Sequence, residues 1–299
     1  MAPPLFSPGP ATDLAYQNLR SGETEWLVAA KTRVEALWGQ FYTFADANFL
    51  TEIRRDLQAR FWEMYLTCAM LQHAESRGYR VSCPKPGPDI LLEFQTSRIW
   101  IEAVTATNGA PGFPDILQPN PKGETTIPEE KIVLRYTNAI QEKYRKYLRY
   151  LRNGHVGKND AYVIAINASN LLHRWTQAED DAPRFVKAVY PLGQYQLLLD
   201  SVTGDIVGHQ NETRFEITKA SGKKVAVHAF LDRQSRGISG VLCSFANPTY
   251  SGPLRLDFEL AHNPVGRSPL PPDLITARRA WTADLNDAGG NLTGRTLIH

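Results

Sequence analysis

Apolar residues up to about position 167 recur with two different periods, which predict alternating helices and strands. Steps of three and four residues indicate helices over three ranges: Glu23–Trp38, Thr51–Arg77 and Pro128–Arg152. Shorter runs rich in β-branched and aromatic residues indicate three strands: Tyr79–Cys83, Asp89–Phe94 and Ile99–Thr105. Ala161–Asn167 is apolar almost throughout, which is typical of a strand buried on both faces of a sheet.

Taken in chain order, these elements predict an α/β core. The polar residues 95–98 separate the second and third strands as a hairpin turn would. We therefore expect the three strands to form an antiparallel meander, with Ala161–Asn167 beside it in a mixed sheet. The helices Thr51–Arg77 and Pro128–Arg152 should pack on that sheet.

The flanking parts of the chain show weaker patterns. We predict a flexible N-terminal arm over residues 1–22, which begin with a proline-rich stretch, and a single elaborated domain over 23–299. Asn108–Pro128 should be a long loop, and Ala182–Val189 a short helix. Further strands are expected to extend the same sheet: Tyr195–Asp200, Arg214–Thr218, Lys223–Leu231, Ile238–Phe245 and Leu254–Leu260. The proline-containing residues 260–299 are predicted to be an irregular arm that wraps the body.

Composition places the chain among ordinary soluble globular proteins. Its 299 residues are 42% hydrophobic and 21% charged, with a formal net charge of +2, so the overall charge does not indicate a polyanion partner. The 3 cysteines are far apart and fit neither a disulfide framework nor a zinc site. The start of the chain lacks the features of a signal peptide, and no apolar run is long enough to span a membrane. We expect a cytoplasmic protein without membrane contact.

Two carboxylates mark a candidate site within the predicted meander. Asp89 follows Gly87-Pro88 at the start of the second strand, and Glu102 lies inside the apolar third strand. A carboxylate in such a strand is costly unless it has a partner. Carboxylates that converge from neighbouring strands provide the oxygen ligands that Mg²⁺ prefers.

The residues Pro88-Asp89, the hairpin and Glu102-Ala103-Val104 resemble the motif of the PD-(D/E)XK nuclease superfamily. Val104 stands where the family motif has lysine. The family's order of helix, meander, helix and strand is found between Thr51 and Asn167. The resemblance implies a restriction-endonuclease-like mixed sheet flanked by helices, here with extra C-terminal strands. It also implies phosphodiester hydrolysis that depends on Mg²⁺ or Mn²⁺, with Asp89 and Glu102 as metal ligands.

Two further residues enter the candidate catalytic set. Glu63 lies on an apolar stripe of the helix before the meander, a helix that often lends a glutamate to the metal site in this family. The alternative is that Glu63 lies at the edge of the buried face and its carboxylate reaches solvent. Lys143 falls on the sheet-facing stripe of the following helix and can replace the motif lysine, with Arg135 in reserve. The alternative for Lys143 is a buried stem with its ammonium group in solvent.

The helix Pro128–Arg152 is also strongly basic, with tyrosines between its charged residues. This pattern favours contact with a phosphate backbone. The candidate nucleic-acid contacts are Lys131, Arg135, Arg145, Lys146 and Arg149. We expect DNA as the partner and leave a homodimer open. The leading hypothesis is a metal-dependent nuclease. The alternative, favoured by Val104, is an inactive module of the same fold that binds nucleic acid or a protein partner.

Overall fold

The helices of the protein follow the apolar periodicity of its sequence. The computed structural model describes residues 2–119, 127–174, 181–271, 274–283 and 292–296. Its helices are α1 (Leu14–Ser21), α2 (Glu25–Phe41), α3 (Phe49–Glu52), α4 (Leu57–Arg77), α5 (Glu129–Arg152) and α6 (Arg184–Lys187), with 3₁₀ turns η1 (Ala229–Leu231) and η2 (Arg233–Ser235).

Eight strands within the described residues form one mixed sheet, in the order β1-β2-β3-β4-β9-β10-β11-β12. Their bounds are β1 (Tyr79–Ser82), β2 (Ile90–Phe94), β3 (Ser97–Thr105), β4 (Ala161–Asn167), β9 (Gly240–Ser244), β10 (Glu259–His262), β11 (Arg279–Ala283) and β12 (Leu292–Thr296). The strands β1, β2 and β3 are antiparallel neighbours, and β4 runs parallel to β3. The predicted meander and the position of β4 beside it are therefore confirmed.

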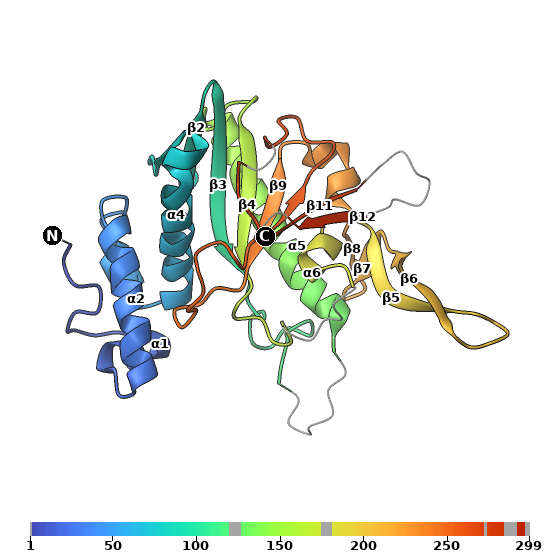
Figure 1. Cartoon of the computed structure of the whole chain (residues 1–299), viewed down its shortest axis with the longest axis horizontal. Coiled ribbons are helices and arrows are strands. Elements are labelled where there is room, and N and C mark those ends of the chain that lie inside the picture. Colours follow the sequence, from blue (N-terminus) through green and yellow to red (C-terminus); the bar gives the residue numbers. More distant parts are fainter. Residues whose placement is uncertain (1, 120–126, 175–180, 272–273, 284–291, 297–299) are drawn as a thin grey trace.

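Alternation along the central strands divides the core into two layers, with α4 on one face of the sheet and α5 on the other (Figure 1). In β3, Ile99 and Ile101 belong to the apolar cluster that contains α4, while Trp100 belongs to the cluster that contains α5. Successive side chains of a strand point to opposite faces. Glu102 therefore shares the α5 face with Trp100 and Val104.

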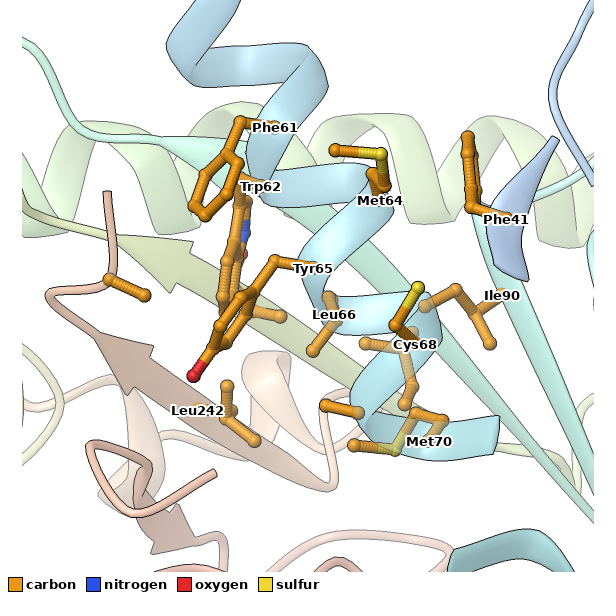
Figure 2. Packing of buried hydrophobic residues seen from close by; sticks show 14 of the residues in the cluster. Phe41, Phe61, Trp62, Met64, Tyr65, Leu66, Cys68, Met70, Ile90 and Leu242 are labelled. Carbon is orange, nitrogen blue, oxygen red and sulfur yellow. The ribbon is translucent and has the colours of Figure 1, made fainter. Parts of the chain in front are cut away.

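Helix α4 begins later than the predicted Thr51–Arg77. Asp56 is its N-cap, and the Asp56 carboxylate accepts a hydrogen bond from the backbone N–H of Ala59 at 3.0 Å. The helix ends at Gly78, which adopts the left-handed conformation (φ 69°) that favours glycine. Figure 2 shows large side chains of α4, among them Trp62 and Tyr65, packed near Leu242 of β9.

Residues 2–22 pack on the body, so the prediction of a flexible arm is wrong for them. Leu5 and Phe6 are buried, and their backbone N–H groups donate to the Glu35 carboxylate at 3.1 and 3.0 Å. Asp13 caps α1, and Tyr16 from α1 donates its hydroxyl to the carbonyl of Leu5. The proline-rich pattern missed this packing because the partner residue Glu35 lies about thirty positions further along the chain.

The region between β4 and β9 differs from the prediction that its strands extend the main sheet. It forms two separate two-stranded sheets instead. Their strands are β5 (Leu192–Leu199), β6 (Ile206–Thr213), β7 (Glu216–Thr218) and β8 (Lys224–Ala226). Each pair is a local hairpin, and β5–β6 projects from the body (Figure 1). The sequence pattern did not predict β6, whose residues are mostly polar or exposed.

The predicted strand over Leu254–Leu260 is largely wrong, because residues 254–257 form turns and β10 starts at Glu259. The prediction of an irregular arm over residues 260–299 holds for residues 263–271 and 274–278, which form neither helix nor strand, and is wrong for the strands at its start and end. There β11 pairs parallel to β10, and β12 pairs antiparallel to β11. Both strands are short, and their pairing depends on neighbours that local periodicity does not reveal. Part of the predicted loop Asn108–Pro128, residues 120–126, lies outside the described residues.

Asp257 connects α4 to the end of β9, which generates a test of the fold. One Asp257 oxygen accepts the Tyr65 hydroxyl at 2.9 Å. The other accepts the Ser244 hydroxyl and the backbone N–H groups of Phe245 and Ala246. We expect Asp257→Ala to lower the free energy of unfolding in urea by about 2–4 kcal/mol, because partly buried donors lose their acceptor. The control is Glu93→Ala, which breaks an exposed ion pair with Arg80 and should cost less than about 1 kcal/mol. Equal losses in the two variants would contradict this role of Asp257.

Candidate active site

A cavity of about 420 Å³ lies where the start of α4, the start of β2, the end of β3 and the middle of α5 meet. Three of the four predicted catalytic residues, Glu63, Asp89 and Lys143, line it directly. The fourth, Glu102, is fully buried and is hydrogen-bonded to two lysines of the lining. The complete lining is Glu52, Asp56, Ala59, Arg60, Trp62, Glu63, Asp89, Ala103, Val104, Thr105, Thr107, Lys143, Lys146 and Asn170.

Glu102 is held in β3 by two cations from α5. Its Oε1 accepts hydrogen bonds from Lys143 Nζ at 3.2 Å and from Lys146 Nζ at 2.5 Å. Its Oε2 is buried and has no hydrogen-bond partner among the described residues. One carboxylate oxygen is thus saturated by cations, while the other keeps lone pairs that nothing in the described part of the chain occupies.

Asp89 is fixed beside Glu102 by the backbone of β3. Its Oδ2 accepts a hydrogen bond from the N–H of Ala103, the residue after Glu102, at 2.8 Å. Its Oδ1 lies 3.8 Å from Lys85 Nζ, beyond hydrogen-bonding distance. The two predicted metal ligands are therefore brought to the same end of the sheet.

Glu63 approaches the cavity from α4, on the other side of the sheet from the lysines. Its carboxylate accepts a hydrogen bond from Arg60 at 2.8 Å, and Arg60 also lies 3.6 Å from Asp46. Burial, with repulsion from Asp89, raises the pKa of Glu63 above its ordinary 4.5 against the opposing effect of Arg60. The alternative of a solvent-reaching Glu63 is not what the structure has, since this residue is 8% exposed.

The charges around Glu102 act in opposite directions. Burial, followed by repulsion from Asp89, raises the pKa of Glu102, although Lys143 and Lys146 both act to lower it. Burial alone would lower the pKa of Lys146, but attraction to Glu102 and the hydrogen bond between them outweigh burial and raise that pKa. Lys146 therefore stays charged near neutral pH, and its charge is directed at Glu102.

The positive charge that a lysine at position 104 of β3 would supply comes from α5 in this protein. Val104 packs against the apolar cluster of the α5 face and carries no charge. Lys143 reaches the carboxylate of the motif instead, as its place on the sheet-facing stripe predicted. A lysine ammonium has three donors, and the bond to Glu102 uses one.

Lys146 is the residue whose place the sequence analysis missed. We predicted it as a backbone contact for nucleic acid, together with the other basic residues of α5, but it lines the cavity and bonds to Glu102. The available signal was its spacing, because residues three apart on a helix are neighbours on one face and Lys146 follows Lys143 by three.

The other predicted nucleic-acid contacts lie elsewhere on α5. Arg145 and Arg149 are exposed. Lys131 donates to the carbonyl of Pro114 at 3.0 Å. Arg135 lines a second, smaller cavity.

The oxygen donors of the site fit a hard divalent ion such as Mg²⁺ or Mn²⁺. The described residues contain no group of three or more His, Cys, Asp or Glu side chains arranged to hold a metal ion. The protein ligands would accordingly be two carboxylates, Asp89 and Glu102. Mg²⁺ is commonly held by one or two carboxylates and completes its coordination with water and substrate phosphate. The unpartnered Glu102 Oε2 is the observation that supports this fit.

Searches of protein-family models, of curated proteins and of solved structures find no match to this chain. Among the described residues, no helix is long and apolar enough to cross a membrane. Arguments about function therefore rest on the site itself.

The raised pKa of Glu63 generates a pH test. A carboxyl whose pKa is higher in the folded state than in the unfolded state favours folding most below about pH 4.5, and this contribution is lost as the pH rises through the folded pKa. Glu63→Gln removes the titration and keeps hydrogen-bonding atoms near Arg60. Its stability relative to the wild type should therefore increase as the pH goes from about 4 to 7, measured by urea unfolding at each pH. The control is Glu93→Gln on the surface, which should show little change. A relative stability of Glu63→Gln that falls with pH would contradict the assignment.

Proposed function

We propose that the protein is a metal-dependent nuclease that hydrolyses phosphodiester bonds in nucleic acid. The observation that carries the proposal is that Asp89 and Lys143 line one cavity, while the buried Glu102 of β3 accepts a hydrogen bond from Lys143. Two carboxylates with a cation beside them are what the reaction requires. A bound divalent ion supplies a polarised phosphoryl oxygen and a water of lowered pKa.

The residues of the chain take distinct roles in this proposal. Asp89 Oδ1 and Glu102 Oε2 would hold the ion, since the opposite oxygen of each carboxylate already accepts hydrogen bonds from the protein. Lys143, with donors left over from its bond to Glu102, would stabilise the negative charge that builds up on the phosphate. Glu63, buried and of raised pKa, would orient a water molecule that approaches from the α4 side.

Lys146 would act as a positioning residue. Its short contact with Glu102 holds the carboxylate in one orientation, with Oε2 left unoccupied. It also balances the negative charge of a site in which Glu63, Asp89 and Glu102 lie close together. Without the two lysines, the buried Glu102 would be an uncompensated charge, which is strongly destabilising.

A second candidate function is an inactive module that binds nucleic acid or a protein partner. The two ion pairs of Glu102 favour this candidate, because Lys143 and Lys146 already neutralise the carboxylate without a metal. Val104 at the motif lysine position agrees with this reading. Metal binding and cleavage distinguish the two candidates.

The first test is nuclease activity with Mg²⁺ or Mn²⁺ on DNA and RNA substrates. Lys143→Met should reduce the cleavage rate about a hundred- to a thousandfold, because a positioned donor to the developing charge is worth this much. Lys146 keeps Glu102 paired in that variant, so its melting temperature should stay near the wild-type value. Lys158→Met, which changes an exposed lysine beyond α5, is the charge-matched control and should cleave normally. A wild-type protein inactive on both substrates would reject the nuclease in favour of the binding module.

The second test is stabilisation by metal. Millimolar Mg²⁺ or Mn²⁺ should raise the melting temperature of the wild type, since a ligand that binds only the folded state stabilises it by mass action. Asp89→Asn should remove this rise, because it deletes one ligand charge yet keeps an acceptor for the Ala103 N–H. Asp205→Asn, at an exposed turn, should retain the full rise. Equal responses in the three proteins would show that the ion binds outside the proposed site.

A further inference from the structure

A second cavity of about 150 Å³ adjoins the candidate active site along the end of β3. Both cavities are lined by Val104, Thr105 and Thr107, so they are neighbouring parts of one depression. The second cavity is completed by Ala106 and by residues of the N-terminal half of α5: Arg135, Asn138, Ala139 and Glu142. A ligand that fills the first cavity can therefore continue into the second.

Arg135 is the basic residue that lines this second cavity. It is half-buried, and its Nε is buried without a hydrogen-bond partner. No carboxylate among the described residues lies within 4.0 Å of its guanidinium, although Asp115 is close enough to attract it. By comparison, the buried Arg184 and the partly buried Arg214 each form ion pairs, at 2.7 Å with Glu129 and at 2.6 Å with Glu212. Burial lowers the pKa of Arg135, and attraction to Asp115 offsets that effect only in part.

The surroundings of Arg135 are shaped to hold its guanidinium in place and leave donors available. Gly109 lies so close to it that a Cβ there would be 2.4 Å from Nη1, and Gly109 has a φ of 102°. The loop after β3 therefore covers one side of the guanidinium. Thr105 lines the same cavity, but as the residue after Val104 in β3 it directs its side chain to the α4 face. A guanidinium is suited to the oxygens of a phosphate group, which it can bind through two parallel hydrogen bonds.

The Glu142 carboxylate lines the same cavity and repels an anion there, but its exposure weakens this repulsion. It is an exposed residue, so water and salt screen its charge. Arg135 lies deeper, where its interactions are screened less. The buried part of the cavity is therefore cationic.

We propose that Arg135 forms a subsite for a second backbone phosphate of the nucleic-acid strand whose cleavage is proposed above; the inference rests on that function. Arg135 precedes Lys143 by eight residues, which is about 12 Å along the axis of α5. This distance exceeds the rise of about 3.4 Å per nucleotide of one strand in a duplex. The substrate is accordingly an oligonucleotide that extends several nucleotides beyond the scissile phosphate, and not a mononucleotide or a small phosphodiester.

The test compares Arg135→Leu with the charge-matched control Arg152→Leu. Arg152 is exposed at the end of the same helix and lines neither cavity. Binding of a fluorescent DNA oligonucleotide is measured by anisotropy in Ca²⁺ over a series of salt concentrations. Arg135→Leu should weaken binding at least tenfold and reduce the slope of log K against log salt by about 0.7 to 0.9, as expected for the loss of one phosphate contact. Arg152→Leu should change both quantities much less.

Two further measurements separate a phosphate subsite from general charge. Arg135→Lys, which keeps the charge without the planar fork, should restore part of the affinity. In Mg²⁺, Arg135→Leu should raise the KM for a long oligonucleotide more than the KM for bis(p-nitrophenyl) phosphate.

The outcomes distinguish the subsite from the nuclease itself. If the wild type cleaves DNA and Arg135→Leu binds and cleaves like Arg152→Leu, the subsite is refuted and the nuclease stands. If the wild type binds DNA without cleaving it, and Arg135→Leu weakens binding as expected, the nuclease is rejected. The subsite is then kept as part of a non-catalytic nucleic-acid-binding protein. A wild type that binds no oligonucleotide overturns both proposals.

Discussion

The buried charge of Glu102 is the constraint on which the rest of the site depends. A carboxylate inside a central strand is unfavourable by several kcal/mol unless cations and hydrogen bonds compensate it. Here both cations, Lys143 and Lys146, come from α5. Because each must reach the same oxygen, the pairing fixes how α5 is rotated and how far it is shifted along the sheet. The same pairing leaves Glu102 Oε2 unoccupied at the cavity end of the strand.

The mixed sheet determines which groups can meet at that point. Alternation along β3 sends its apolar residues to α4 and α5 in turn, and it directs Glu102 and Val104 to the α5 side. Asp89 joins them because its carboxylate is bonded to the backbone of Ala103. Glu63 arrives from α4 on the opposite layer. Acids from both sides of the sheet and lysines from one side thus surround a single cavity, an arrangement that no single element could provide.

Val104 lies where the two cavities meet, since it lines both of them. A lysine at this position would project into the space that Val104 shares with both cavities. With valine there, α5 supplies the cation, and the apolar side chain of Val104 lies where the two cavities adjoin. The basic residues of α5 then divide into different environments. Lys143 and Lys146 form ion pairs with the Glu102 carboxylate, Arg135 is half-buried in the second cavity, and Arg149 is exposed.

The sequence by itself determined the elements of the core and the side of each element on which the acids and Lys143 lie. Local periodicity sets these, since the positions of side chains around a helix or along a strand follow from its geometry. The tertiary structure alone decided that Lys146 bonds to Glu102 and that Arg135 lies in a cavity under Gly109. It also decided the packing of the N-terminal residues and the pairing of β11 and β12. These features depend on contacts between segments far apart in the chain, and periodicity within a segment carries no information about its distant partner.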